Sequence, residues 1–226
     1  MTRICRYLSL LFLLLFCMQF ANAQSQFDLN VGFGSAQDKS LGSVDVNTLN
    51  PCTTGSLQCA TTPDLKNFML GFGMNLMLWK HFGVGGVIDV QPGRQDYLVF
   101  SPSGAGQVGD VLQDRITFYD FNGIFRPFAS KRADLQLFGG IGGAHVSFYE
   151  KFTANSAVLG NSQQTQFAGS SNHFQVHGGV GVQIYLNDHF FMRPQVQVRD
   201  VHNFSQFGRD LVTEESVFIG YSWGDR

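Results

Sequence analysis

The stretch 172–201, NHFQVHGGVGVQIYL, NDH and FFMRPQVQVRDV, shows the pattern that decides the fold. Apolar residues alternate with polar residues or glycine in each half, and a period of two residues is that of a β-strand with one apolar face. Asn187-Asp188 between the halves is a hairpin turn signal. The stretch therefore predicts two antiparallel strands joined by a tight turn.

The same alternation recurs along the chain and predicts eight strands. The segments between them alternate between long and short, which is the loop rhythm of bacterial outer-membrane barrels, with short periplasmic turns and longer outer loops. A spanning strand needs about 9–11 residues, and each segment provides them. We expect an all-β, eight-stranded up-and-down antiparallel transmembrane β-barrel with both termini in the periplasm. The predicted strands are 26–35, 67–79, 82–100, 115–126, 135–151, 172–186, 190–201 and 212–223.

The first 23 residues predict a secretory signal peptide. Arg3 and Arg6 precede a charge-free apolar run, 7–20, and Ala21-Asn22-Ala23 supplies a small-x-small cleavage site. No stretch of about 20 apolar residues follows, which excludes ordinary transmembrane helices. We expect cleavage of 1–23 and a single barrel domain at 24–226.

The composition favours a wall in contact with lipid. Charged residues make up 14% of the chain, against about 25% in soluble domains. Loss of the leader's two arginines takes the formal net charge from −2 to −4. Nucleic-acid binders need clustered Lys and Arg, so we expect no nucleic-acid partner.

The layout of 26–223 resembles the small outer-membrane barrels typified by the membrane domain of outer-membrane protein A and by its relatives X and W. Phe218, Tyr221 and Trp223 resemble the aromatic C-terminal signal read by the barrel-assembly machinery, although Gly224-Asp225-Arg226 follow. The resemblance implies a Gram-negative outer-membrane location, contact with outer-membrane lipid and lipopolysaccharide, and insertion by that machinery. We expect a monomer that needs no cofactor.

The polar face of the strands predicts a charged barrel interior. Acids and arginines there can pair across the lumen, since buried charges need partners. We interpret the set as structural packing, and the alternative is a narrow polar path for small solutes. The inward residues are Asp28, Asn30, Asp89, Gln91, Asp120, Asn122, His177, Gln183, Arg193, Gln195, Gln197, Arg199 and Glu214.

Cys52 and Cys59 lie in a long polar loop, with six residues between them. Two cysteines in an oxidising compartment most simply form a disulfide. A metal site is the alternative, but it would need more ligands, and this loop offers no His. We predict a disulfide that stiffens an exposed loop.

His145 and Ser147 form a His-x-Ser pair on one strand face. The spacing resembles that of the outer-membrane lipid A 3-O-deacylases, in which the His acts as base and the Ser as nucleophile. Phe148 stands where that family has Asn, and Glu150 is too close in sequence, and on the wrong face, to match its acid. The alternative is a pair of interface residues near the outer rim.

Other polar and aromatic groups receive structural interpretations. His173 and His177 would be about 13 Å apart on a strand, which disfavours a shared metal. We expect a solvated rim from Arg94, Asp96, Asp110, Asp114 and Arg115. Aromatic residues near strand ends predict interfacial girdles: Tyr97, Phe100, Phe118, Tyr119, Phe148, Tyr149, Tyr185, Phe190 and Phe191.

Three functions are compatible with this sequence. The first is a non-enzymatic outer-membrane barrel with a structural, adhesive or porin-like role. The second is a narrow channel for small or apolar solutes. The third is hydrolysis of lipid A esters through His145 and Ser147.

Overall fold

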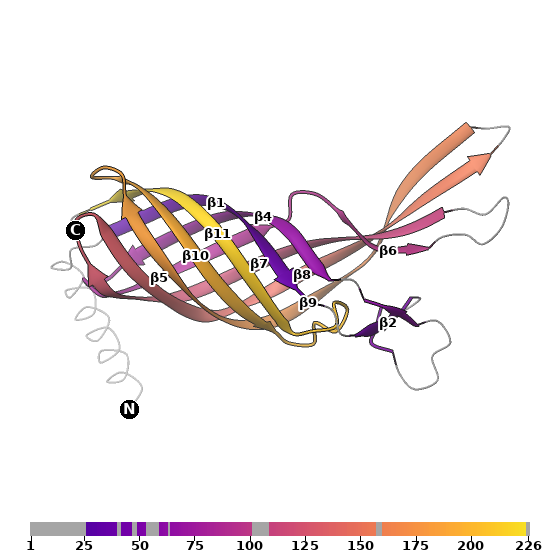
Figure 1. The fold of residues 1–226 in the computed structure, drawn as a ribbon, viewed down its shortest axis with the longest axis horizontal. Helices are drawn as coiled ribbons and strands as arrows, with labels where there is room; N and C mark the ends of the chain where they lie inside the picture. Colours follow the sequence, from indigo (N-terminus) through magenta and orange to yellow (C-terminus); the bar gives the residue numbers. More distant parts are fainter. Residues whose placement is uncertain are drawn as a thin grey trace, which may run out of the picture.

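Eight antiparallel strands close into a ring (Figure 1). The computed structural model describes residues 26–39, 42–46, 49–52, 59–62, 64–100, 109–156 and 160–224, so the predicted leader lies outside the described residues. Ring neighbours follow chain order, and the first strand pairs with the last, which confirms the eight-stranded up-and-down barrel. The ring strands are β1 (Gln26–Asp38), β4 (Leu65–Met77), β5 (Phe82–Val90), β7 (Gly109–Ala129), β8 (Ala133–Ser156), β9 (Gly160–Tyr185), β10 (Phe190–Val201) and β11 (Leu211–Trp223).

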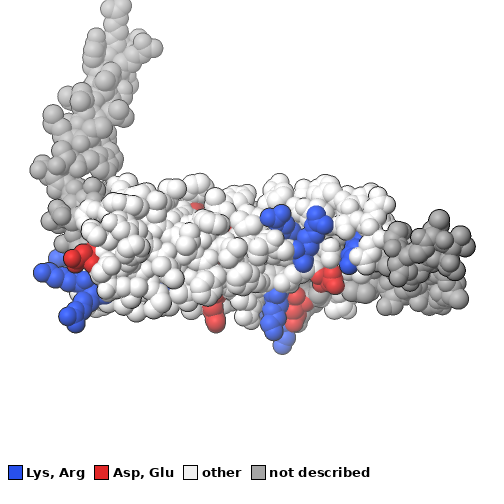
Figure 2. Space-filling model, turned by 90° about the horizontal axis from the view of Figure 1, so that it is seen from above, with Lys and Arg blue, Asp and Glu red and all other residues white. Residues whose placement is uncertain are grey.

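Side chains alternate between the inside and the outside of the ring. In β4, buried and exposed residues alternate at every position. Large apolar side chains cover the outside, among them Val31, Phe72, Phe121 and Ile141, each more than half exposed. On the face shown in Figure 2, most Lys and Arg side chains lie toward the two ends of the wall. Within the described residues, no helix is long and apolar enough to cross a membrane.

The predicted third strand, 82–100, is interrupted. β5 ends at Val90, and β6 (Gln95–Phe100) resumes the pairing with β7 after a break. Pro92-Gly93 lies in this break. Proline has no N–H for the ladder, and glycine weakens a strand, so the pair ends the regular pairing.

A four-stranded sheet continues past the barrel mouth (Figure 1). Pairing of β8 with β9 runs to Ser156 and Gly160, and β7 begins at Gly109. The predicted loop over 152–171 is therefore wrong, and the loop over 101–114 is shorter than predicted. In its β9 part, consecutive side chains from Gln163 to Ala168 are all exposed, and such a strand lacks the alternation that the prediction relied on.

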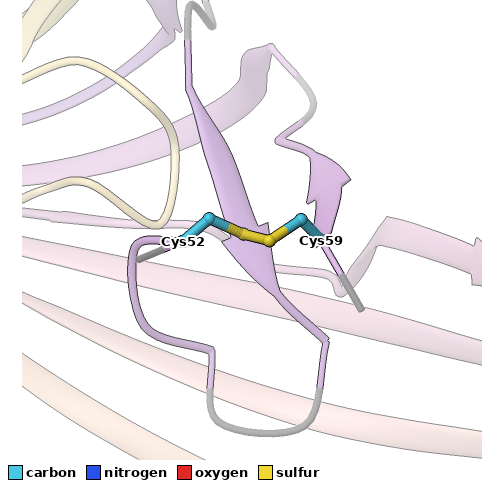
Figure 3. The surroundings of a disulfide bond; sticks show 2 residues. All are labelled: Cys52 and Cys59. Carbon is cyan, nitrogen blue, oxygen red and sulfur yellow. A yellow bond between two sulfur atoms is a disulfide. The ribbon is translucent and has the colours of Figure 1, made fainter. Parts of the chain in front are cut away.

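The long segment between β1 and β4 carries a small hairpin of its own. β2 (Ser43–Asp45) pairs with β3 (Cys59–Thr61). A disulfide joins Cys52 to Cys59, with Cα atoms 6.0 Å apart, as predicted (Figure 3). Val44 of β2 is fully buried in an apolar cluster with side chains of the barrel, so the hairpin is docked on the barrel mouth.

Candidate functional site

The centre of the barrel interior is an ion-pair cluster around Arg199 of β10. Its Nη2 atom lies 2.6 Å from Oδ2 of Asp89 and 3.0 Å from Oδ2 of Asp120. Its Nη1 atom donates to Glu214. Since β10 and β5 lie on opposite sides of the ring, the Arg199–Asp89 pair crosses the whole lumen.

Amides and an imidazole complete this central cluster. Nε2 of Gln197 donates to Oδ2 of Asp120 at 2.8 Å. Nδ1 of His177 lies 3.3 Å from the other oxygen of Asp120, and its Nε2 lies 2.7 Å from Oδ1 of Asn122. The guanidinium of Arg199 lies over the ring of Phe118, 4.5 Å from its centroid. Side chains from several strands thus pack together in this cluster.

A second polar cluster lies nearer the end of the barrel that carries the short turns. Nη2 of Arg126 on β7 lies 3.2 Å from Oδ2 of Asp28 on β1, and its Nη1 lies 3.5 Å from Asp134. Gln26 joins the cluster by donating to the hydroxyls of Tyr185 and Ser222, at 2.8 Å each. The Arg126–Asp28 and Gln26–Tyr185 contacts link strands that are not neighbours in the ring, whereas the other two join neighbouring strands.

All seven ionisable residues expected inside the barrel lie there, six of them charged and the seventh His177. Their exposed fractions do not exceed 5%. Five of them belong to the Arg199 cluster, and Asp28 belongs to the Arg126 cluster. Arg193 stands between the two, donating to Gln136 at 3.2 Å. Arg126 and Asp134 also face inward and neither was predicted, although Arg126 lies on the same strand face as Asp120 and Asn122.

The mouth of the barrel is filled by apolar side chains. Phe204 and Phe207, from the segment between β10 and β11, are almost completely buried. Phe207 packs edge-on against Tyr97, whose hydroxyl donates to the backbone carbonyl of Gln206. This apolar cap consists of Ala36, Val44, Leu65, Met69, Tyr97, Leu112, Ile116, Phe118, Ala144, Val146, Phe148, Val201, Phe204, Phe207 and Val212.

The apolar cap corrects the predicted aromatic girdles. Tyr97, Phe118 and Phe148 point inward and are buried, as are Tyr185 and Phe191 near the other end. Above the level of the membrane, an inward position need not be polar, because the lumen can be closed by a hydrophobic core. Only the outward aromatics, such as Tyr119 and Phe190, fit a girdle.

One small cavity lies among the inward side chains. A cavity between Arg193, Asn122 and Gln136 measures about 10 Å³, which is about one water molecule. With ion pairs across the lumen and the apolar cap above them, the barrel has the form of a filled cylinder.

The ring has a seam at the break between β5 and β6, where the ladder between β4 and β5 stops at the Leu70–Val90 pair. β6 pairs with β7 only, within the described residues. Side chains bridge this seam: Nδ2 of Asn67 donates to Gln91 at 2.8 Å and to Asp114 at 3.2 Å.

Asp114 is therefore part of the wall. It is 3% exposed, which corrects its assignment to a solvated rim. It lies above the outward apolar residues of β7, which begin at Tyr119. Burial raises the pKa of its carboxyl from 3.8 to about 7, against the lowering effect of the hydrogen bond from Asn67.

His145 and Ser147 lie side by side on β8. Oγ of Ser147 is 3.1 Å from Nε2 of His145, whose Nδ1 is 2.7 Å from Oδ1 of Asn172 on β9. A hydroxyl, an imidazole and an orienting group in this order resemble a nucleophile, a base and a positioning group. Ser147 is only 9% exposed, and Asn172 provides an amide where a carboxylate would stabilise an imidazolium. Sequence spacing did not reveal Asn172, because strand pairing brings it there.

His173 and His177 have separate partners. His173 contacts Ser171 and the carbonyl of His202, whereas His177 belongs to the Arg199 cluster. Among the described residues, no group of three or more His, Cys, Asp or Glu side chains could hold a metal ion.

No protein-family model and no curated protein sequence matches the chain. Solved structures do match it. The outer membrane protein OprG from Pseudomonas aeruginosa is 15% identical, with 90% of this chain and 98% of OprG covered and a TM-score of 0.50. The fold is that of small bacterial outer-membrane barrels. The attachment invasion locus protein Ail of Yersinia pestis, solved with the heparin analogue sucrose octasulfate, is 14% identical over 88% of this chain and 99% of Ail, with a TM-score of 0.48.

Proposed function

We propose that this chain is a bacterial outer-membrane barrel protein with a structural and adhesive role, and that its main role is not enzymatic. The observation that carries the proposal is the filled lumen. Arg199 bridges opposite sides of the ring, and the apolar cap closes the mouth above it. Such a barrel presents outer segments from a rigid wall, and ion pairs cross the path that a solute would take. This arrangement favours the structural role over the narrow channel.

The membrane placement rests on the outer surface. Apolar side chains cover the wall and the ring is closed, so backbone groups need no water in the hydrocarbon layer. Short turns lie at one end, near Lys80, Arg132 and Asp188, and the extension lies at the other. We assign the short turns and both termini to the periplasm, with lipopolysaccharide around the outer end and a monomer as the assembled form. The barrel-assembly machinery would insert it.

The adhesive role rests on the extension. Within the described residues, the part of β9 from 160 to 172 pairs with β8 alone, and β6 pairs with β7 alone. The segment 152–187 contains no Asp, Glu, Lys or Arg. Free strand edges without charge accept an added strand from another polypeptide. The extension is thus suited to hold an extended segment of a partner protein.

Conductance in planar bilayers tests the filled lumen. We expect the refolded protein to give no steady discrete openings, while a general porin inserted in the same way conducts. Discrete single-channel steps would overturn the structural role in favour of the channel. For adhesion, we expect cells that express a variant lacking 153–167 to attach less to wells coated with extended, strand-forming peptides than cells with the intact chain, at equal amounts in the outer membrane.

Ester hydrolysis is a second candidate, favoured by the hydrogen-bonded series Ser147–His145–Asn172. The side chains lie on the outward face of β8 and β9, just above exposed Ile141 and Phe174, where an ester of a membrane lipid could approach. In such a reaction Oγ of Ser147 would attack the ester carbonyl while His145 accepts the hydroxyl proton. The ester C–O bond would break and His145 would protonate the departing alcohol, after which water would release the fatty acid from Ser147. The proposal predicts that lipid A from cells expressing the protein loses an acyl chain and that Ser147→Ala restores it. An identical acyl pattern by mass spectrometry, with and without the protein, eliminates this candidate.

A further inference from the structure

Three basic side chains surround the seam on the outside of the barrel. Lys66 on β4, Arg94 before β6 and Arg115 on β7 are all exposed. The ladder between β4 and β5 ends at the Leu70–Val90 pair, and Lys66 and Arg94 lie four residues beyond it on either side. Nε of Arg115 donates to the backbone carbonyl of Gln91 at 3.2 Å, which places Arg115 at the same break.

Lys66, Arg94 and Arg115 bring three positive charges to the seam, and Asp96 lies two residues from Arg94. Among the described residues, none of the three forms an ion pair. The guanidinium of Arg94 lies over the ring of Tyr149, 3.9 Å from its centroid. Asp96, the acid on the same strand, accepts a hydrogen bond from Gln113 at 2.9 Å. Like charges around one gap repel, so this cluster favours an anion between them.

The height of the cluster indicates which anion this is. Phe68 and Leu70 on β4 and Tyr119 on β7 project outward below the basic residues, and each is more than a third exposed. Apolar and aromatic side chains of this kind mark the boundary of the hydrocarbon layer. Cations just above that boundary lie at the level of the lipid headgroups, where outer-leaflet lipids carry phosphate.

We propose that Lys66, Arg94 and Arg115 form a binding site for the phosphate groups of an outer-leaflet lipid, which covers the seam. The acyl chains of that lipid lie against Phe68 and Leu70, and the phosphates bridge β4 and β7 where the backbone ladder is absent. Arginine suits this role because its planar fork can bind two phosphate oxygens at once. The site rests on the proposed outer-membrane placement.

Native mass spectrometry of the full mature chain, with bis-phosphorylated and with dephosphorylated lipid A, tests the site. The variant is Lys66→Gln/Arg94→Gln/Arg115→Gln. The matched control, Lys80→Gln/Lys131→Gln/Arg132→Gln, removes three cations at the opposite end. We expect the intact chain to prefer the phosphorylated lipid and the first variant to lose about tenfold in affinity, since three exposed charge pairs contribute about 0.5 kcal/mol each. The control variant is expected to bind like the intact chain.

Several results would overturn the site. They are equal binding of the two lipids, unchanged binding by the first variant, an equal loss in the control variant, or displacement of the lipid by millimolar inorganic phosphate, which would indicate a site for free phosphate. Because Arg115 contacts the backbone at the break, Arg94→Lys/Arg115→Lys provides a second variant, and we expect it to retain part of the preference. Cell fractionation separately tests the membrane placement, so failure of the site is distinguishable from failure of the proposed function.

Discussion

Arg199 is the residue on which the barrel interior depends most. Asp89, Asp120 and Glu214 all contact its guanidinium, and it is completely buried. Removing one charge from such a cluster leaves its partners buried with neither a counter-charge nor solvent. This is far more unfavourable than the loss of an exposed ion pair. The packing of this one side chain therefore bears directly on stability.

Arg199→Met is expected to lower the free energy of unfolding by about 3–5 kcal/mol, because three carboxylates lose their shared cation. Urea unfolding in phospholipid vesicles, followed by the gel mobility of the folded form, measures the change. Arg132→Met in an exposed turn is the control, with an expected change within about 0.5 kcal/mol. Equal unfolding midpoints for the two variants would contradict this account of the interior.

Asp114 predicts a pH dependence at the seam. Burial raises the pKa of its carboxyl to about 7 from 3.8. The folded chain thus holds this proton more tightly than the unfolded chain does. The protonated Asp114 carboxyl therefore contributes to the free energy of unfolding. This contribution is fully present below about pH 4, is lost as the pH rises through about 7, and amounts to at most about 4 kcal/mol.

Asp114→Asn is expected to flatten the decline in stability between pH 4 and 7. Part of the slope remains, since burial also raises the pKa of Asp38 to about 7. Asp38→Asn/Asp114→Asn should remove both contributions. Thermal unfolding in detergent at a series of pH values is the measurement, and a slope unaffected by either variant would show that neither carboxyl titrates as inferred.

At the scale of elements, strand alternation predicts the membrane wall and fails outside it. β10 has the predicted bounds, because each of its residues faces either lipid or the lumen. In the segment 152–171 the side chains do not divide into a lipid face and a lumen face, and its pairing within β8 and β9 was not predicted. Pro92 and Gly93, which cause the break, can be read in the sequence. The hydrogen bonds from Asn67 to Gln91 and Asp114 cannot, because they depend on contacts between strands. In the same way Asn172 reaches His145 only through strand pairing.

The disulfide acts on the β2–β3 hairpin. Cys52→Ser/Cys59→Ser is expected to speed cleavage of the segment 39–64 by thermolysin, since a short cross-linked loop restrains the open chain by about 2–3 kcal/mol. Unfolding of the barrel itself should change little, because neither cysteine lies in a ring strand. Cleavage at the same rate as in the intact chain would show that docking through Val44 alone holds the hairpin.

The whole molecule has two unlike ends, and this predicts its orientation. An epitope inserted between Gln164 and Thr165 is expected to be accessible on intact cells, while one at the C-terminus becomes accessible only after permeabilisation. The reverse pattern would place the extension in the periplasm. Barrel signal in the inner-membrane fraction would contradict outer-membrane placement altogether.

The pairing of β1 with β11 joins the first and the last of the described strands, through residue pairs such as Phe27 and Trp223. Synthesis must therefore be almost complete before a watertight cylinder can exist. A product that stops before Leu211 would leave two unsatisfied strand edges, which hydrocarbon cannot hydrate. Chains that lack β11 therefore cannot insert stably into the bilayer. Because of this strand order, only a chain that includes β11 can form the barrel.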